Sequence, residues 1–102
     1  IVQLRVFSDN NKKINILLEN SCASILVVSQ FTLYGNCSKG NRPSFINSAS
    51  AKEAQPLYKY FVSKLKEFNI NVQTGKFGEM MDIKLINNGP VTLIMESKNE
   101  KN

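Results

Sequence analysis

One stripe of apolar side chains limits what this chain can fold into. Four large apolar residues recur at spacings of three and four, which places them on one face of a helix: Leu57, Phe61, Leu65 and Phe68. The tract Ser50–Glu53 before them matches the capping-box pattern S-x-x-E, which marks a helix start. Because Pro56 has no backbone N–H, we expect a bend there or a helix that begins later. The rest of the chain must pack against this amphipathic helix.

Short apolar or alternating runs on both sides of the helix predict strands. The predicted strands lie at 2–6, 24–34, 70–74, 83–85 and 91–95, with a further apolar piece of uncertain type at 14–18. The run Ser24–Tyr34 is apolar on both faces in its middle, which is typical of a central strand. We therefore expect a single α/β (α+β) domain over residues 1–102, in which one long helix covers a mixed sheet.

The amino-acid composition limits the kinds of partner and site that this chain can have. The net charge of +5 fits a polyanionic partner as well as an ordinary solvated surface, because the lysines are dispersed and only Arg5 and Arg42 are arginines. The chain has no histidine, the commonest general base and metal ligand. Cys22 and Cys37 are far apart, so we expect no metal, no cofactor and reduced thiols. The longest apolar run, Ile25–Val28, is too short to span a membrane.

Several hydroxyl groups lie near the ends of predicted strands. Ser29, Thr32 and Thr92 could act as nucleophiles only with a base beside them, and Lys76 or Lys84 would have to replace the missing histidine. The alternative is that these hydroxyl groups bond to the backbone. The sequence alone favours this second interpretation.

A Gly-Pro step and three side chains that precede it in the sequence could each bind a ligand or have a purely structural role. Proline lowers the cost of a cis peptide, so Gly89-Pro90 could present main-chain atoms to a small ligand, or it could be an ordinary hairpin turn. Phe77, Met80 and Met81 could stack on a nucleobase or belong to the core.

Together these tracts resemble the D-aminoacyl-tRNA deacylase family. The similarity is carried, in family order, by short tracts at 4–7, 29–34 (Ser-Gln-Phe-Thr-Leu-Tyr), 39–45, 57–61, 74–78 and 87–92 (Asn-Asn-Gly-Pro-Val-Thr). Each tract is short, but their joint occurrence covers nearly the whole chain from Leu4 to Thr92.

The resemblance implies a homodimer with a barrel-like mixed sheet. It implies a cytoplasmic, tRNA-binding hydrolase that cleaves the ester between a D-amino acid and the 3′-terminal adenosine of tRNA, which is chiral proofreading in translation. By the same resemblance, Ser29, Gln30, Phe31 and Thr32 line the pocket. A cis Gly89-Pro90 turn would enter the partner subunit's pocket and reject L-amino acids by a main-chain clash.

The family also implies roles in catalysis and tRNA binding. Main-chain N–H groups near Phe31 and Thr32 would stabilise the oxyanion, and the ribose 2′-hydroxyl would position or activate water. The competing view, ranked second, makes Thr92 a covalent nucleophile.

Phe77 and Met81 match family positions near the terminal adenine. The basic turn with Lys39 and Arg42 is expected to contact the tRNA backbone.

Two departures from the family pattern qualify the resemblance. Glu79 and Met80 stand where the family has a small residue and an acid, which displaces the acid. The chain begins at Ile1 inside an apolar alternation, so we expect it to lack the family's N-terminal segment. A non-catalytic tRNA- or nucleic-acid-binding protein on the same scaffold is the alternative function.

Overall fold

The computed structural model describes residues 1–8, 14–17, 23–88 and 91–97. Its elements are β1 (Arg5–Ser8), β2 (Ile14–Leu17), β3 (Ser24–Val27), the 3₁₀ turn η2 (Phe31–Tyr34), α1 (Ala51–Lys66) and β4 (Asn71–Thr74). This mixture of one long helix with short strands confirms the α/β class.

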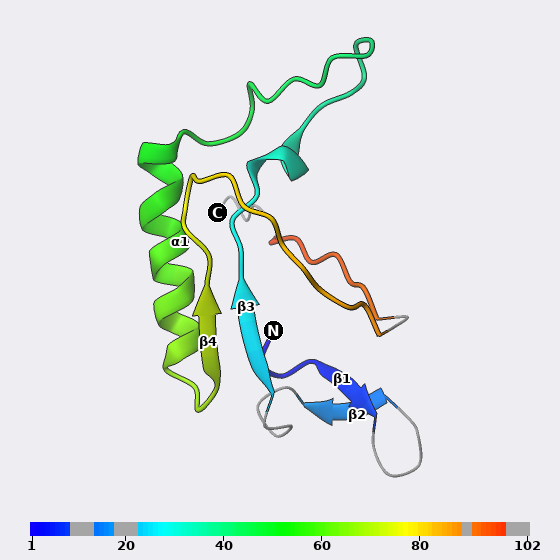
Figure 1. Ribbon diagram of the computed structural model, residues 1–102, viewed down its shortest axis with the longest axis vertical. Helices are drawn as coiled ribbons and strands as arrows, with labels where there is room; N and C mark the ends of the chain where they lie inside the picture. Colours follow the sequence, from blue (N-terminus) through cyan, green and yellow to red (C-terminus); the bar gives the residue numbers. More distant parts are fainter. Residues whose placement is uncertain (9–13, 18–22, 89–90, 98–102) are drawn as a thin grey trace, which may run out of the picture.

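The strands form two small sheets. β1 pairs with β2 in antiparallel fashion, and β3 pairs with β4 in parallel, with Ser24 opposite Asn71 and Val27 opposite Thr74. The connection from β3 to β4 contains α1, which lies beside β4 (Figure 1). A parallel pair needs such a crossover. Within the described residues the sheets are not closed into a barrel, so the predicted closure is not confirmed.

The helix begins where the capping box predicts. Ser50 is the N-cap, and its hydroxyl accepts a hydrogen bond of 3.3 Å from the backbone N–H of Glu53. The prediction of a later start at Pro56 is wrong, because α1 already begins at Ala51. Proline at this position lacks the N–H that would bond to the carbonyl of Lys52, one turn earlier, and the helix nevertheless continues to Lys66.

The strand predictions fail where the described part of the chain supplies no neighbouring strand. The long predicted strand at 24–34 ends at Val27, and the first strand begins at Arg5 rather than at residue 2. The segments 83–85 and 91–95 are not strands. Among the described residues, β3 has a ladder partner only along its own four residues, opposite β4. Alternating apolar and polar residues indicate a segment that can join a sheet. The segment becomes a strand only when a neighbouring strand supplies the ladder hydrogen bonds.

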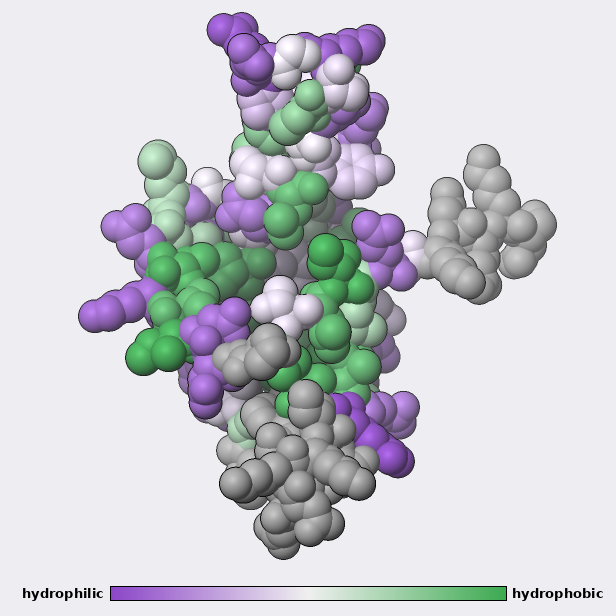
Figure 2. All heavy atoms as spheres, turned by 90° about the vertical axis from the view of Figure 1, so that its right-hand side faces the viewer, coloured by the Kyte–Doolittle hydropathy of each residue, from purple (hydrophilic) through white to green (hydrophobic). Residues whose placement is uncertain are grey.

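The described fold leaves much apolar surface uncovered. The accessible area is 9560 Å², whereas a compact protein of 11.5 kDa exposes about 5,800 Å². The radius of gyration is 16.3 Å, against about 13 Å for a compact domain of this length. Figure 2 shows hydrophobic surface gathered on the face opposite α1. Seven exposed apolar side chains come from residues 83–95: Ile83, Leu85, Ile86, Val91, Leu93, Ile94 and Met95.

Candidate active site

Three segments meet at the carbonyl oxygen of Val27, the last residue of β3. This oxygen accepts hydrogen bonds from the Tyr58 hydroxyl of α1 (3.1 Å) and from the backbone N–H of Gly75 after β4 (3.3 Å). The meeting point lies at the carboxyl ends of two parallel strands, where α/β sheets commonly bind ligands. The tract Ser29–Thr32 follows directly in the chain.

The tract that was predicted to continue the strand forms the 3₁₀ turn η2 instead. Ser29 is half-buried, while Gln30, Phe31 and Thr32 are exposed. The side-chain amide of Gln30 donates a hydrogen bond to the Thr32 hydroxyl. The Phe31 ring meets Phe45 edge-on, with 5.2 Å between ring centroids and an interplanar angle of 76°. Phe31 is nevertheless 61% exposed, so much of its ring surface is free for a ligand.

Gly35 permits this aromatic contact. Its backbone N–H donates to the carbonyl of Thr32 (3.0 Å) and closes η2. A Cβ at Gly35 would lie 2.8 Å from the Phe45 ring and 3.1 Å from the Thr32 carbonyl oxygen. Sequence reasoning missed the roles of Gly35 and Phe45. A glycine directly after an aromatic run was the only sequence signal for them.

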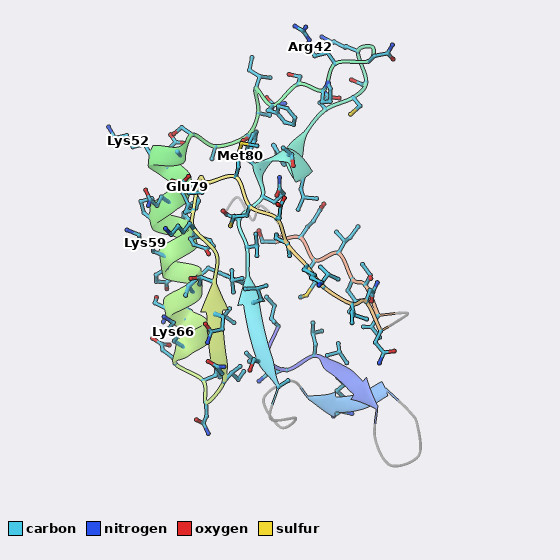
Figure 3. All side chains as sticks on the ribbon, viewed as in Figure 1. Arg42, Lys52, Lys59, Lys66, Glu79 and Met80 are labelled. Carbon is cyan, nitrogen blue, oxygen red and sulfur yellow. The ribbon has the colours of Figure 1, made fainter. Side chains whose placement is uncertain are left out.

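The basic turn lies at the tip of an extended loop. Asn36 and Ser44 close the base of the loop through two backbone hydrogen bonds of 2.8 and 2.9 Å. Lys39 and Arg42 are exposed, and Arg42 lies at the far end of the loop (Figure 3). The structure therefore does not bring these two side chains to η2.

The predicted adenine-binding residues lie near the end of β4. The Phe77 ring packs obliquely on Tyr58, with centroids 5.4 Å apart. A Cβ at Gly75 would lie 2.6 Å from the Met81 sulfur, so the missing side chain lets Met81 pack on the backbone. Phe77 and Met81 are half-buried, whereas Met80 is fully exposed. Sequence reasoning missed the hydrogen bond of Tyr58. A buried tyrosine hydroxyl requires a partner, and this was the available signal.

Thr92 is not brought to η2 in the described chain. Its hydroxyl accepts a hydrogen bond of 3.4 Å from the side-chain amide of Asn87, within its own segment. Gly89 and Pro90, the predicted chirality gate, lie outside the described residues.

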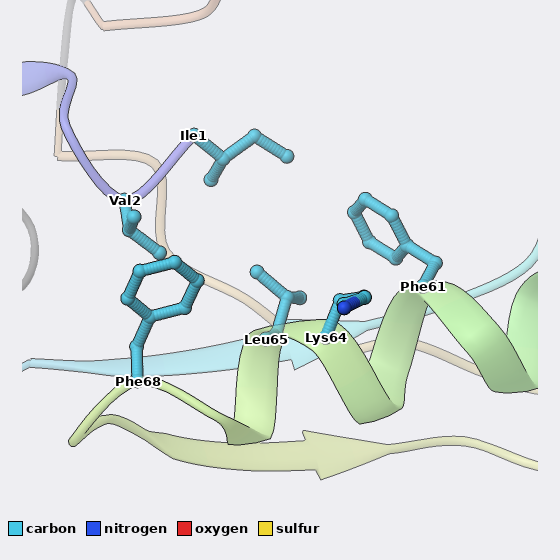
Figure 4. Close-up of a pocket in the computed structure, with 6 residues that line it drawn as sticks. All are labelled: Ile1, Val2, Phe61, Lys64, Leu65 and Phe68. Carbon is cyan, nitrogen blue, oxygen red and sulfur yellow. The ribbon is translucent and has the colours of Figure 1, made fainter.

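The remaining features do not resemble a catalytic centre. A shallow pocket of about 200 Å³ beside the C-terminal half of α1 is almost wholly apolar, and its only charged lining residue, Lys64, pairs with Glu67 (Figure 4). Its lining residues are Ile1, Val2, Phe61, Lys64, Leu65 and Phe68. No group of three or more metal-ligating side chains occurs among the residues that the structure describes. None of the described helices is long and apolar enough to cross a membrane.

Comparisons with known proteins give the family. A family model described as D-Tyr-tRNA(Tyr) deacylase matches residues 1–96. A protein of Thermosipho melanesiensis named D-aminoacyl-tRNA deacylase is 54% identical over 99 residues, which are 96% of this chain and 66% of that protein. Proteins of the same name from Desulfatibacillum aliphaticivorans and Brevibacillus brevis are 54% and 52% identical over 96% and 95% of this chain, and 67% of each. This chain spans about two thirds of the length of these relatives, and it belongs to the D-Tyr-tRNA(Tyr) deacylase family.

Proposed function

We propose that this protein hydrolyses the ester bond of D-aminoacyl-tRNA and releases the free D-amino acid and tRNA. The observation that carries the proposal is identity of about 50% to relatives named D-aminoacyl-tRNA deacylase over nearly the whole chain. Such a reaction removes D-amino acids from tRNA before the ribosome can use them. Because this substrate is cytoplasmic, we place the protein in the cytoplasm.

The proposed pocket wall is the tract Ser29–Thr32, used mainly through its backbone. A short 3₁₀ turn leaves its first N–H groups without partners inside the turn, because its hydrogen bonds join each residue to the third one before it. In η2 these include the N–H groups of Phe31 and Thr32. They are proposed to stabilise the oxyanion that forms when water attacks the ester carbonyl. The terminal ribose 2′-hydroxyl would position that water.

The hydrogen bonds of the threonines support this main-chain mechanism over a side-chain nucleophile. The Thr32 and Thr92 hydroxyls each accept from a side-chain amide, of Gln30 and Asn87 respectively. An amide N–H cannot take the proton that a hydroxyl must lose to attack an ester. A neutral hydroxyl in this state can still donate a hydrogen bond to substrate.

The proposed active assembly is a homodimer in which Gly89-Pro90 of one subunit enters the pocket of the other. The uncovered apolar face supports this, because monomeric proteins rarely expose contiguous apolar patches of more than a few hundred Å². A rigid turn would clash with the side chain of an L-amino acid and leave that of a D-amino acid outside. Glycine suits the turn because a Cβ would occupy the space of the ligand.

The rest of the substrate is proposed to contact the flanking residues. Phe77 and Met81 lie half-buried beside Tyr58 and Gly75, where an adenine could stack on their exposed surface. Lys39 and Arg42, at the loop tip, are free to meet a phosphate distant from the ester.

The test is a release assay on tRNA charged with D- or L-tyrosine. The proposal predicts rapid release of D-tyrosine and no release of L-tyrosine above the uncatalysed rate. Equal release of both would contradict chiral proofreading. Binding of tRNA without any release would instead identify a non-catalytic tRNA-binding protein.

A further inference from the structure

A row of lysines runs along the outer side of α1. Lys52, Lys59 and Lys66 are seven residues apart, and seven residues turn a helix by nearly two full turns. The three Cα atoms therefore lie within about 40° of one another around the axis and span about 21 Å. All three side chains are exposed. Figure 3 shows Lys52 and Lys59 extending from α1 on the side turned away from β4.

Among the residues of α1, no acidic side chain shares the sector of this lysine row. Gln55 and Ser63 share its sector of the helix, whereas Glu53 and Glu67 lie about 120° and 80° around the axis from Lys59. In the described chain the ion pair of this helix joins Glu67 to Lys64, at 3.5 Å, and none involves the lysine row. Three positive charges therefore remain available to an external partner.

The neighbours of the row favour a polyanion over a lipid surface. A helix that lies on a membrane needs apolar side chains beside its basic ones. Val62 and Leu65 of α1 are buried in the fold. Its large exposed apolar side chains, Leu57, Tyr60 and Phe61, lie about 100° to 160° around the axis from Lys59, outside the row. Point charges on flexible stems are suited to phosphates, which they bind without reading sequence.

The position of the lysine row on the fold favours RNA over other polyanions as its partner. The N-terminal end of α1, which carries Lys52, lies level with η2 and with the segment after β4, at the same end of the long axis (Figure 1). The row thus starts level with the candidate active site along this axis and leads away from it. We infer that Lys52, Lys59 and Lys66 bind the phosphate backbone of the double-helical RNA that adjoins the 3′ end of the substrate tRNA. This inference rests on the proposed function for the identity of the RNA.

The experiment measures the affinity of uncharged tRNA as a function of salt concentration. Each phosphate contact contributes about 0.9 to the slope of log K against log salt for a duplex, so K52Q/K59Q/K66Q should lower the magnitude of the slope by about 2 to 3. Its affinity at low salt should fall by about tenfold or more. Glutamine is a good helix former, so α1 is expected to remain intact, as circular dichroism would verify.

Two matched variants complete the test. K52R/K59R/K66R keeps the charges and should keep both affinity and slope. K64Q removes a lysine that already pairs with Glu67 and lies outside the row, and should leave the slope unchanged. An unchanged slope in the glutamine triple variant, or an equal effect of K64Q alone, would overturn the inference.

A parallel assay of D-tyrosyl-tRNA hydrolysis separates this inference from the proposed function. The glutamine triple variant should raise KM and leave kcat unchanged, because the row touches no reacting atom. Failure of the unsubstituted protein to hydrolyse D-tyrosyl-tRNA would overturn the proposed function, while a lysine-dependent slope would still support the row. If the protein hydrolyses D-tyrosyl-tRNA but the salt slope is the same with and without these lysines, only the inference about the lysine row is overturned.

Discussion

The hydroxyl of Tyr58 donates a 3.1 Å hydrogen bond to the carbonyl oxygen of Val27, 31 residues earlier in the chain. This contact connects the middle of α1 to the end of β3, directly before the tract Ser29–Thr32. The same oxygen accepts from Gly75. One carbonyl therefore joins the helix, the end of the sheet and the start of the candidate pocket.

Removing this hydroxyl should destabilise the fold measurably. Tyr58→Phe keeps the ring that packs on Phe77 but loses a part-buried hydrogen bond, which costs about 0.5 to 1.5 kcal/mol. Tyr60→Phe is the matched control, because Tyr60 is 62% exposed on the same helix. Urea unfolding followed by circular dichroism would measure both variants. An equal loss of stability in the two would show that the Tyr58 hydroxyl has no special role.

Gly35 should tolerate no side chain without moving Phe45. Gly35→Ala places a methyl group 2.8 Å from the Phe45 ring, and overpacking of this kind typically costs about 1 to 3 kcal/mol. We expect the Phe31–Phe45 contact to be lost, which the ring-proton chemical shifts of both residues would report. Asn41→Ala, at the exposed tip of the same loop, should change neither the shifts nor the stability.

Met81 should contribute to substrate binding, and Met80 should not. Met81→Ala removes a half-buried thioether beside Gly75, and such a contact with an adenine ring is worth about 0.3 to 1.5 kcal/mol, or roughly a two- to tenfold rise in KM. Met80→Ala removes an adjacent methionine that is fully exposed. Steady-state kinetics on D-tyrosyl-tRNA would compare them. A larger effect of Met80→Ala would place the adenine elsewhere.

Replacing Thr92 distinguishes the two mechanisms. The main-chain mechanism predicts that Thr92→Ala retains hydrolysis within about tenfold, since it loses only a hydrogen-bonding group worth at most about 1.5 kcal/mol. If Thr92 were a covalent nucleophile, Thr92→Ala would instead abolish turnover. Single-turnover rates with D-tyrosyl-tRNA measure the difference, and a trapped acyl-enzyme in the unsubstituted protein would contradict the main-chain mechanism outright.

The helix and the strand at 71–74 were predictable because their causes are local. The cap at Ser50 and the stripe from Leu57 to Phe68 follow from neighbouring residues, and α1 begins directly after the cap. The segment 71–74 is a strand as its alternation predicts. The extension of β3 to Tyr34 was wrong because the neighbour that would continue the ladder is not present in the described chain.

The site was predictable only as a set of residues, not as an arrangement. Contacts such as Tyr58 with Val27 and Phe31 with Phe45 join segments that no periodicity relates. The reason for a glycine at position 35 is the close approach of the Phe45 ring, which only the structure reveals. The arrangement of Gly89 and Pro90 stays a prediction, since both lie outside the described residues.

The proposed enzyme discriminates between the D and L forms of an amino acid, and a ratio of two rate constants measures this discrimination. Single-turnover hydrolysis of D-tyrosyl-tRNA and L-tyrosyl-tRNA, with the same tRNA and protein in excess, isolates the chemical step from product release. Chiral proofreading predicts a ratio of at least about one hundred in favour of the D-ester, which corresponds to about 2.7 kcal/mol of transition-state discrimination. A ratio near one would contradict it.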